Sequence, residues 1–328
     1  MKNLKRFTFL ITSVFLAASV CISHAAEILH ADHPLANKVW DMSKGDFVEV
    51  SELMSTLNES DVLLLGEVHD NVLHHELQQR LLKARIDSGA QPALMMEQIN
   101  AANQAALDLA LSGDDRKIKL EAVNKLIGFN NWKHYSPFLE LAVEHHLPVI
   151  ASNTPNRELR PVIWNGYEAY DADKLKQLAV EEVWNESRQK FLAASMGGAH
   201  CGQLREELRV GLTRSQRLKD ALMVDSAVSN IGRGVVGIVG SSHARRDIGL
   251  PLYFSARDPK AKIVSIGFVE VTPGKVNPNA YTGSATGEVP FDYAWFTPRM
   301  ARENPCAGVD MEAEMSKPVH KQSGQVEE

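Results

Sequence analysis

Short apolar runs that stop at polar residues are the feature that most constrains the fold of this chain. The run 61–65, Asp-Val-Leu-Leu-Leu, ends at Gly66. The run 92–96, Pro-Ala-Leu-Met-Met, ends at Glu97. Such runs are typical of strands buried on both faces, as in parallel sheets. Three later runs have the same character: 147–151, 234–239 and 262–268.

Segments with helical spacing of apolar residues lie between these runs. Leucines at helical spacing predict a helix over 72–87, an Ala- and Leu-rich stretch predicts one over 101–111, and an amphipathic stretch predicts one over 135–146. Strands that alternate with helices favour a parallel sheet covered on both faces. The predicted fold class is therefore α/β, with a parallel-rich central sheet flanked by helices.

The long interval between the third and fourth predicted strands has no strand signal. Residues 155–232 predict several helices, including 173–195 and 214–230, which join near Gly197-Gly198. This interval is too long for a single crossover helix, so we interpret it as a helical insertion, or lid. Beyond Thr272 the chain is rich in Pro, Gly and Asn.

The N-terminus has the order of a secretory signal. A basic start precedes an uncharged apolar run over 7–22 and the small residues Ser23-His24-Ala25. We expect a signal peptide over 1–25, cleaved after Ala25, and a periplasmic protein. Lipidation at Cys21 is the alternative and would give a membrane-anchored lipoprotein, although Val20 is bulky for that reaction.

We expect the mature chain to be one α/β domain over 26–309, followed by a disordered polar tail over 310–328. The formal charge of −6 becomes more negative when a leader with three basic residues and no acid is removed. An acidic chain without a Lys/Arg-rich run is a poor candidate for nucleic acid. No later stretch is apolar enough to cross a bilayer. Cys201 and Cys306 could pair in an oxidising compartment.

Residues able to transfer protons or bind metals stand at the predicted strand ends. Glu67 and His69 follow the first strand, Glu97 follows the second, and His243 follows the fourth in Gly240-Ser-Ser-His. Ligands of an open parallel sheet bind outside the carboxyl ends of its strands. Two carboxyls and two imidazoles should therefore converge on one crevice.

This group allows two kinds of chemistry. Glu67 and His69 lie two positions apart, so an extended chain directs both side chains to one face. That pair suits a general base held by a carboxylate, or half of a metal site. With Glu97 and His243 the set could bind zinc or another divalent metal and activate water. The sequence has no Gly-x-Ser-x-Gly, which disfavours a serine esterase.

Several motifs, in order, resemble the ChaN family of haem-binding uptake proteins, a relative of Tiki/TraB-like and erythromycin-esterase-like proteins. They cover most of residues 60–250, and their combination is far more specific than any single piece. The motifs are Val62-Leu-Leu-Leu-Gly-Glu-Val-His-Asp70 with His74-His75, Met95-Met-Glu97, Asn131-Trp-x-x-Tyr135-x-Pro137, Ala142 through Pro148-Val-Ile-Ala-Ser-Asn153, and Gly240-Ser-Ser-His243.

The resemblance implies an exported haem-binding protein of iron uptake, often a lipoprotein, that forms a dimer enclosing two haems face to face. It also implies a tyrosine as iron ligand. Tyr167 and Tyr170 are candidates, and His200 lies in a glycine-rich segment that could reach a cofactor. Tyr135 is a further candidate, or a buried tyrosine with a tethered hydroxyl. Arg245 and Arg246, just after His243, could pair with propionates, although adjacent arginines are usually solvated.

The leading hypothesis is therefore non-covalent haem binding through Tyr or His, since the sequence has no Cys-x-x-Cys-His for covalent attachment. A haem receptor or transporter components would be its partners. The alternative is a periplasmic hydrolase, metal-dependent or based on His and Glu, that uses Glu67, His69, Glu97 and His243. The sequence leaves open whether the chain is an enzyme.

Overall fold

The computed structural model describes residues 27–113, 115–127, 132–199, 201, 203–281, 283–284, 287–303 and 306–307. The signal peptide predicted over 1–25, Cys21 and the tail predicted over 310–328 lie outside the described residues. The strands are β1 Ile28–Leu29, β2 Val39–Asp41, β3 Asp46–Val48, β4 Val62–Glu67, β5 Ala93–Asn100, β6 Val149–Asn153, β7 Val235–Gly240, β8 Ile263–Glu270, β9 Tyr293–Thr297 and β10 Arg299–Met300.

An eight-stranded sheet in the order β3-β2-β9-β8-β4-β7-β5-β6 organises the molecule. The six strands from β9 to β6 are parallel to their neighbours, while β2 and β3 pair antiparallel at one end. The parallel strands confirm the predicted α/β class. Strands β1 and β10 form a separate two-stranded sheet.

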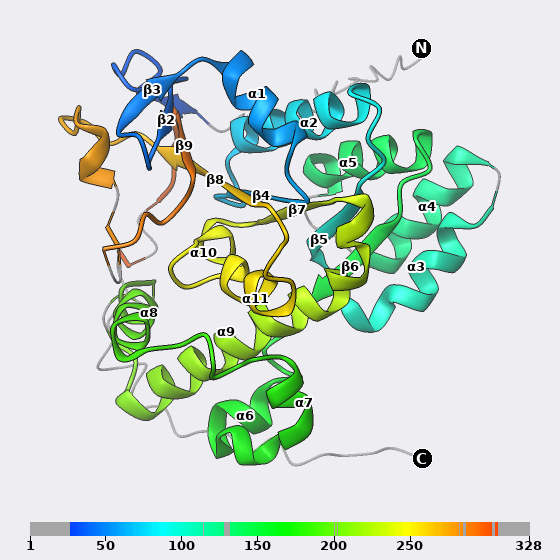
Figure 1. Ribbon diagram of the computed structural model, residues 1–328, viewed down its shortest axis with the longest axis vertical. Helices are drawn as coiled ribbons and strands as arrows, with labels where there is room; N and C mark the ends of the chain where they lie inside the picture. The colour runs from blue at the N-terminus through cyan, green and yellow to red at the C-terminus, as the bar shows by residue number, and fades with distance from the viewer. Residues whose placement is uncertain are drawn as a thin grey trace, which may run out of the picture.

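Helices cover both faces of the large sheet (Figure 1). Helices α1 to α5 pack on one face, and α9, α10 and α11 pack on the other. The helices are α1 Val50–Asn58, α2 Val72–Asp87, α3 Gln104–Leu111, α4 Arg116–Ile127, α5 Trp132–Glu144, α6 Arg160–Asn165, α7 Ala172–Gln177, α8 Glu186–Ala199, α9 Glu206–Ala227, α10 Ser241–Ala244 and α11 Leu250–Arg257, with short 3-10 turns at Ala101–Asn103, Tyr167–Ala169, Val228–Arg233 and Pro278–Tyr281.

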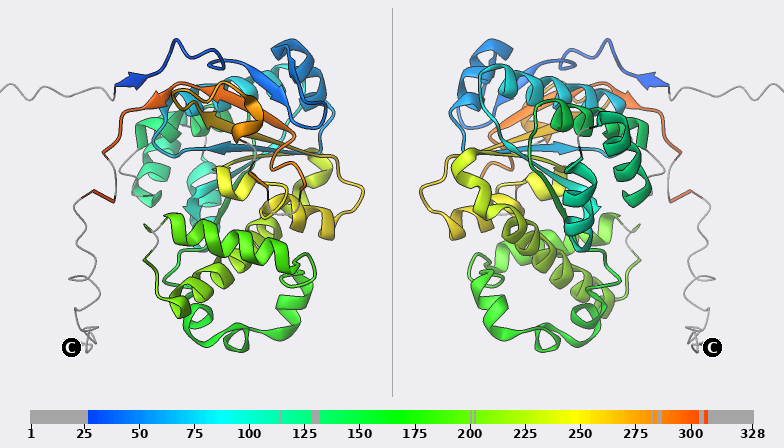
Figure 2. Two further views of the ribbon diagram at one scale, coloured as in Figure 1. Left: turned by 90° about the vertical axis from the view of Figure 1, so that its left-hand side faces the viewer. Right: turned by 90° about the vertical axis from the view of Figure 1, so that its right-hand side faces the viewer.

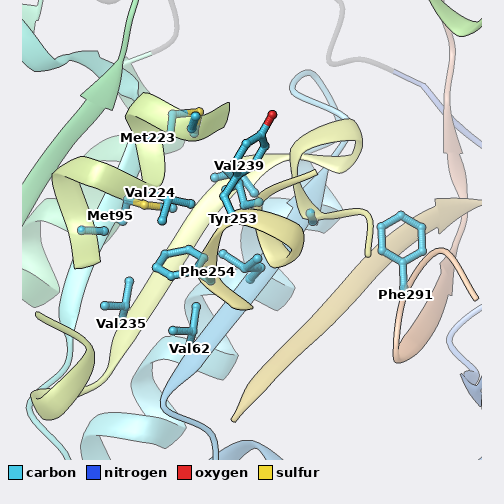
Figure 3. Packing of buried hydrophobic residues seen from close by; sticks show 14 of the residues in the cluster. Val62, Met95, Met223, Val224, Val235, Val239, Tyr253, Phe254 and Phe291 are labelled. Carbon is cyan, nitrogen blue, oxygen red and sulfur yellow. The ribbon is translucent and has the colours of Figure 1, made fainter. Parts of the chain in front are cut away.

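Alternation along the central strands divides the interior into two hydrophobic cores. Val62 and Leu64 of β4 face the core under α9 and α11, whereas Leu63 and Leu65 face the core under α2 and α5. Figure 3 shows Val62 in the first core together with Phe254 of α11. Because both faces of β4 are buried, its sequence is continuously apolar rather than alternating.

The sheet is wider than the sequence predicts. Strand β9 lies inside the Pro-, Gly- and Asn-rich region beyond Thr272, where no strand was expected, and yet all five of its residues are buried. Strands β2 and β3 come from the mixed segment before β4. The three-residue strands β2 and β3 carry little periodic signal, and β9 lies among turn-forming residues, so pairing with distant strands decides the conformation of all three.

Helices α6 to α9 lie between β6 and β7, where the helical insertion was expected, and they form a layer beside the sheet (Figure 2). The single helix predicted over 173–195 is wrong, since α7 and α8 replace it. The chain turns between them at Ala179, whose φ is 55°, and both Leu178 and Val180 insert into the core. Among the described residues, no helix is long and apolar enough to span a membrane.

Candidate functional site

The carboxyl ends of β4, β5 and β7 bring the four predicted crevice residues together. His69 donates from Nδ1 to Glu67 Oε1 over 2.9 Å, and its Nε2 lies 3.9 Å from Glu97 Oε1. His243 Nε2 lies 3.2 Å from the same Glu97 oxygen. The His69 side chain remains 56% exposed, while the other three side chains are largely enclosed. His69 therefore stands at the solvent edge between two carboxylates.

Small residues allow this close arrangement. A side chain at Gly66 would place its Cβ 2.7 Å from Cβ of Ala244 and 3.1 Å from Cα of Ser241, so glycine lets α10 lie directly against β4. Ser241 then donates from Oγ to the carbonyl of Glu67 over 2.9 Å. A Cβ at Gly240 would stand 3.0 Å from Nε2 of His69.

Glu67 accepts hydrogen bonds from several elements. The Tyr135 hydroxyl of α5 donates to Oε1 over 2.6 Å, and Gln98 Nε2 donates to the same oxygen over 3.1 Å. His75 of α2 places Nε2 3.3 Å from Oε2. Burial by itself would raise the pKa of Glu67, but the contacts with His69 and His75 lower it to about 2. Glu67 is therefore a carboxylate at neutral pH.

A second network surrounds Glu97 on the opposite face of the sheet. The Gly240 amide donates to Oε2 over 2.6 Å. His243 bridges Glu97 and Asp220 of α9, to which its Nδ1 donates over 2.5 Å. Burial would lower the pKa of His243, but the charges of Glu97 and Asp220 raise it to about 10. His243 is therefore an imidazolium that joins two buried carboxylates.

Sequence reasoning missed Asp220 and Gln216. Both lie in the interior of α9, and Gln216 Nε2 contacts His243 Nδ1 over 3.2 Å and Asp220 Oδ1 over 3.3 Å. Their spacing of four places them on one helix face, which is a signal that the sequence does contain. Tyr135 is 3% exposed with its hydroxyl tethered, which agrees with the alternative of a buried tyrosine.

The expected metal site is not supported by this geometry. Among the described residues there is no group of three or more His, Cys, Asp or Glu side chains that could hold a metal ion. The physical reason is that the side chains are already paired with one another: Glu67 with His69, and His243 with Asp220 and Glu97. A zinc-dependent hydrolase is accordingly not favoured.

An apolar pocket of about 450 Å³, which we call the α8 pocket, opens beside this group. Its lining comes mainly from α8, from the end of β8 and from the start of α10. The lining residues are Val68, Phe191, Leu192, Ser195, Met196, Ser241, Ser242, Arg245, Ile248, Phe268, Val269, Glu270 and Phe291. Glu67, His69, Glu97 and His243 do not line this pocket, which is a ligand-sized cavity next to the predicted crevice.

A family model described as "Haem-binding uptake, Tiki superfamily, ChaN" matches residues 53–254 of this chain. The chain belongs to the ChaN family. The match spans the strand-end group and the insertion, and it confirms the resemblance carried by the sequence motifs. No match was found among curated proteins.

One of the solved structures similar to this chain supports the ChaN fold. The structure described as cofacial heme binding to ChaN of Campylobacter jejuni has a TM-score of 0.62 and 21% identity, over 81% of this chain and 97% of that one. The type III effector HopBA1 has 14% identity over 76% and 92% of the two chains, with a TM-score of 0.39. The erythromycin esterase EreC has 11% identity over 81% and 82%, with a TM-score of 0.35.

The candidate iron ligands of this ChaN-family chain do not lie together with the strand-end group. The Tyr167 hydroxyl donates to the carbonyl of Arg214 over 3.1 Å, and burial raises its pKa to about 12. Tyr170 is half-buried, and burial raises its pKa as well. Neither tyrosine lines the α8 pocket. His200 lies outside the described residues.

Proposed function

We propose that this protein is exported, binds haem non-covalently and takes part in haem or iron uptake. The observation that carries the proposal is the α8 pocket: an apolar cavity at the strand ends of a chain that belongs to a haem-binding uptake family. A porphyrin is a flat, apolar ring with two carboxylates, so it needs apolar and aromatic walls together with a polar rim.

The walls of the α8 pocket fit such a ring. Phe191 and Phe291 supply aromatic surface. The Arg245 guanidinium lies 4.7 Å from the ring centre of Phe191, and it forms two hydrogen bonds of 2.7–2.8 Å with Asp247. Because Asp247 already neutralises it, Arg245 serves more as a polar rim than as a free propionate partner.

We propose His200 as the first iron ligand to test. It follows Ala199, the last residue of α8, and Ser195 and Met196 of that helix line the α8 pocket. Tyr167 and Tyr170 are the alternative ligands, since a phenolate holds ferric iron in some haem proteins. Ionising Tyr167 would be costly because burial raises its pKa.

Hemin titration tests the proposed function. We expect a Soret band that saturates with added hemin. Of the variants His200→Ala, Tyr167→Phe and Tyr170→Phe, the one that removes the iron ligand should show a changed Soret band. Ser195→Glu should weaken hemin binding by at least about tenfold, since a larger, charged side chain on the pocket lining blocks the ring and repels the propionates. A titration in which hemin absorbance is simply additive would refute haem binding.

A neighbouring residue provides the matched control for the pocket. Ala194 is exposed on the same helix turn and does not line the α8 pocket. Ala194→Glu adds the same charge at an adjacent, equally exposed position outside the pocket lining. The hemin affinity of this variant should stay within about twofold of that of the unmodified protein. Equal losses in both variants would place the haem elsewhere.

Export and assembly complete the proposal. We propose a periplasmic protein with cleavage after Ala25, or a lipoprotein anchored through Cys21. We also propose a homodimer that holds two haems, delivering to a receptor or transporter. The intact mass of the protein from the periplasmic and membrane fractions distinguishes the two forms. Sedimentation with and without hemin tests the dimer, and a monomer under both conditions would contradict it.

A further inference from the structure

We infer that the disulfide between Cys201 and Cys306 is a clasp that holds the last turn of α8 beside the α8 pocket, so that thiol–disulfide exchange sets how firmly the pocket keeps its ligand. The two cysteines are bonded, with their Cα atoms 5.8 Å apart and a separation of 105 positions in sequence. The inference rests on the proposed function only for the identity of the ligand.

The C-terminal end of this covalent link is anchored to the part of the pocket lining that β8 contributes. Arg302 donates from Nη1 and Nη2 to Glu270 over 2.6 Å and 2.7 Å, and from Nε to Asp70 over 2.5 Å. Glu270 lines the pocket at the end of β8. Cys306 stands only four positions after Arg302, so the disulfide connects a fixed point on the β8 wall to the α8 wall.

The other end of the link meets the weakest part of α8. Gly197 and Gly198 occupy its last turn, and glycine is among the poorest helix formers. Neither glycine is required by packing. A Cβ at Gly198 would meet nothing within 4 Å, and one at Gly197 would meet only Cδ of Arg209, at 3.9 Å. The last turn therefore has little intrinsic stability and depends on an external tether.

The backbone at Cys201 also requires a constraint. Its φ is 61°, in the left-handed region that residues with a Cβ seldom adopt, and its amide donates to the carbonyl of Gly198 over 3.2 Å. Glycine is the usual residue in this conformation after a helix. The disulfide holds Cys201 in this backbone conformation, and without the disulfide the residue could return to a negative φ.

The rest of α8 is attached independently of the disulfide. Leu192 is buried in the interior, and Arg188 donates to the carbonyl of Val183 over 2.7 Å and pairs with Glu288 over 3.1 Å. Opening the disulfide should therefore release the last turn, which carries Ser195 and Met196 of the pocket wall, while the first turns of the helix stay in place.

Thiol–disulfide exchange with a dithiol can open the Cys201–Cys306 bond. A dithiol, such as dithiothreitol, attacks the disulfide through a mixed disulfide. Its two sulfurs then close into a cyclic disulfide, and the two hydrogen atoms that they lose end on the sulfurs of Cys201 and Cys306. The dithiol is oxidised by two electrons and the protein is reduced by two, so no further reactant is needed.

Hydrogen exchange and hemin titration of the full mature protein test the clasp together. With dithiothreitol, or in the Cys201→Ser/Cys306→Ser variant, amides from Ser195 to Gly198 should exchange at least about tenfold faster, while those of β4 stay unchanged. The hemin dissociation constant should rise by about tenfold. The serine variant should not respond to dithiothreitol, which excludes a new thiolate ligand as the cause.

Hemin titration and hydrogen exchange can contradict the proposed function and the clasp independently of each other. If the oxidised protein binds no hemin, the proposed function is wrong, while the exchange rates still decide whether the disulfide holds α8. If those rates are the same with and without the disulfide, the clasp is wrong whatever the hemin affinity.

A second substitution locates the effect in the helix itself. Gly198→Ala, placed in the Cys201→Ser/Cys306→Ser protein, strengthens the last turn without touching a neighbour. We expect it to slow exchange in that turn and to recover part of the hemin affinity. No slowing would show that the weakness is not in the last turn of α8 and would overturn the clasp.

Discussion

Glu67 links more elements than any other residue at the strand ends. It belongs to β4, accepts hydrogen bonds from α5 through Tyr135 and from β5 through Gln98, and pairs with His69 at the crevice rim. Its side chain has no exposed area. Burying a carboxylate is costly, and each of these three donors, all of which contact Oε1, offsets part of the desolvation cost of Glu67.

Replacing Glu67 with Gln should destabilise the protein by about 3 kcal/mol, because the amide cannot accept from Tyr135, Gln98 and His69 with the strength of a carboxylate. Urea unfolding at neutral pH measures this loss. Asp87→Asn is the control, since Asp87 belongs to an exposed pair with Lys83 on α2 and should leave the unfolding midpoint unchanged. A Glu67→Gln midpoint equal to that of the control would show that the carboxylate contributes nothing.

At the scale of elements, the contact between β4 and α10 sets the position of the whole crevice. The end of β4 lies against α10, which is a single helical turn, and Ser241 of that turn donates a hydrogen bond to the Glu67 carbonyl. The same turn carries His243 to the second network. The two networks therefore share one packing contact, and a shift in it would move both.

Gly66→Ala tests this contact. The new Cβ would stand 2.7 Å from that of Ala244, closer than packed carbon atoms allow, so α10 must shift. We expect a loss of about 1–3 kcal/mol in unfolding free energy by chemical denaturation. Gly232→Ala is the matched control, since its Cβ would meet nothing within 4 Å and stability should hold or rise slightly. Equal stability of the two variants would contradict the packing argument.

At the scale of the whole molecule, buried ionised pairs make stability depend on pH. The pKa values of Glu67 and Glu97 lie at about 2, below the ordinary 4.5, so their contribution is present above pH 4.5 and is lost as pH falls towards 2. The pKa of His243 is raised to about 10, so its contribution is complete below pH 6.5 and is lost as pH rises towards 10.

Buried His74 adds to the loss of stability at acid pH. Burial lowers its pKa to about 4, so the neutral ring contributes stability above pH 6.5 that is lost as pH falls towards 4. Stability should therefore peak near pH 6.5. By pH 9 the unfolding free energy should fall by about 2–3 kcal/mol through His243 alone. Urea midpoints from pH 4 to pH 9 measure the profile.

Salt separates this effect from surface charge. His243 and its partners are buried, so the loss on the alkaline side should persist at high ionic strength, where exposed pairs are screened. A profile that is flat between pH 6.5 and 9, or that flattens in salt, would show that the His243 pairs do not stabilise the fold.

The sequence by itself determined the parallel core and the residues at its strand ends. Continuous apolar runs such as 61–65 read as buried strands because both faces of these strands are covered, and Glu67, Glu97 and His243 follow such runs directly. Parallel strands end at one edge, so their convergence followed from order along the chain. The family motifs lie in the same positions.

Only the tertiary structure decided what these residues do to one another. Asp220 reaches His243 from a helix of the insertion, and Tyr135 reaches Glu67 from α5. The local sequence around Asp220 and Tyr135 does not show which residue either one pairs with. These contacts join residues 23 and 68 positions apart. They convert a set that could have bound a metal into two ion-pair networks, because a buried charge takes the nearest partner that folding provides.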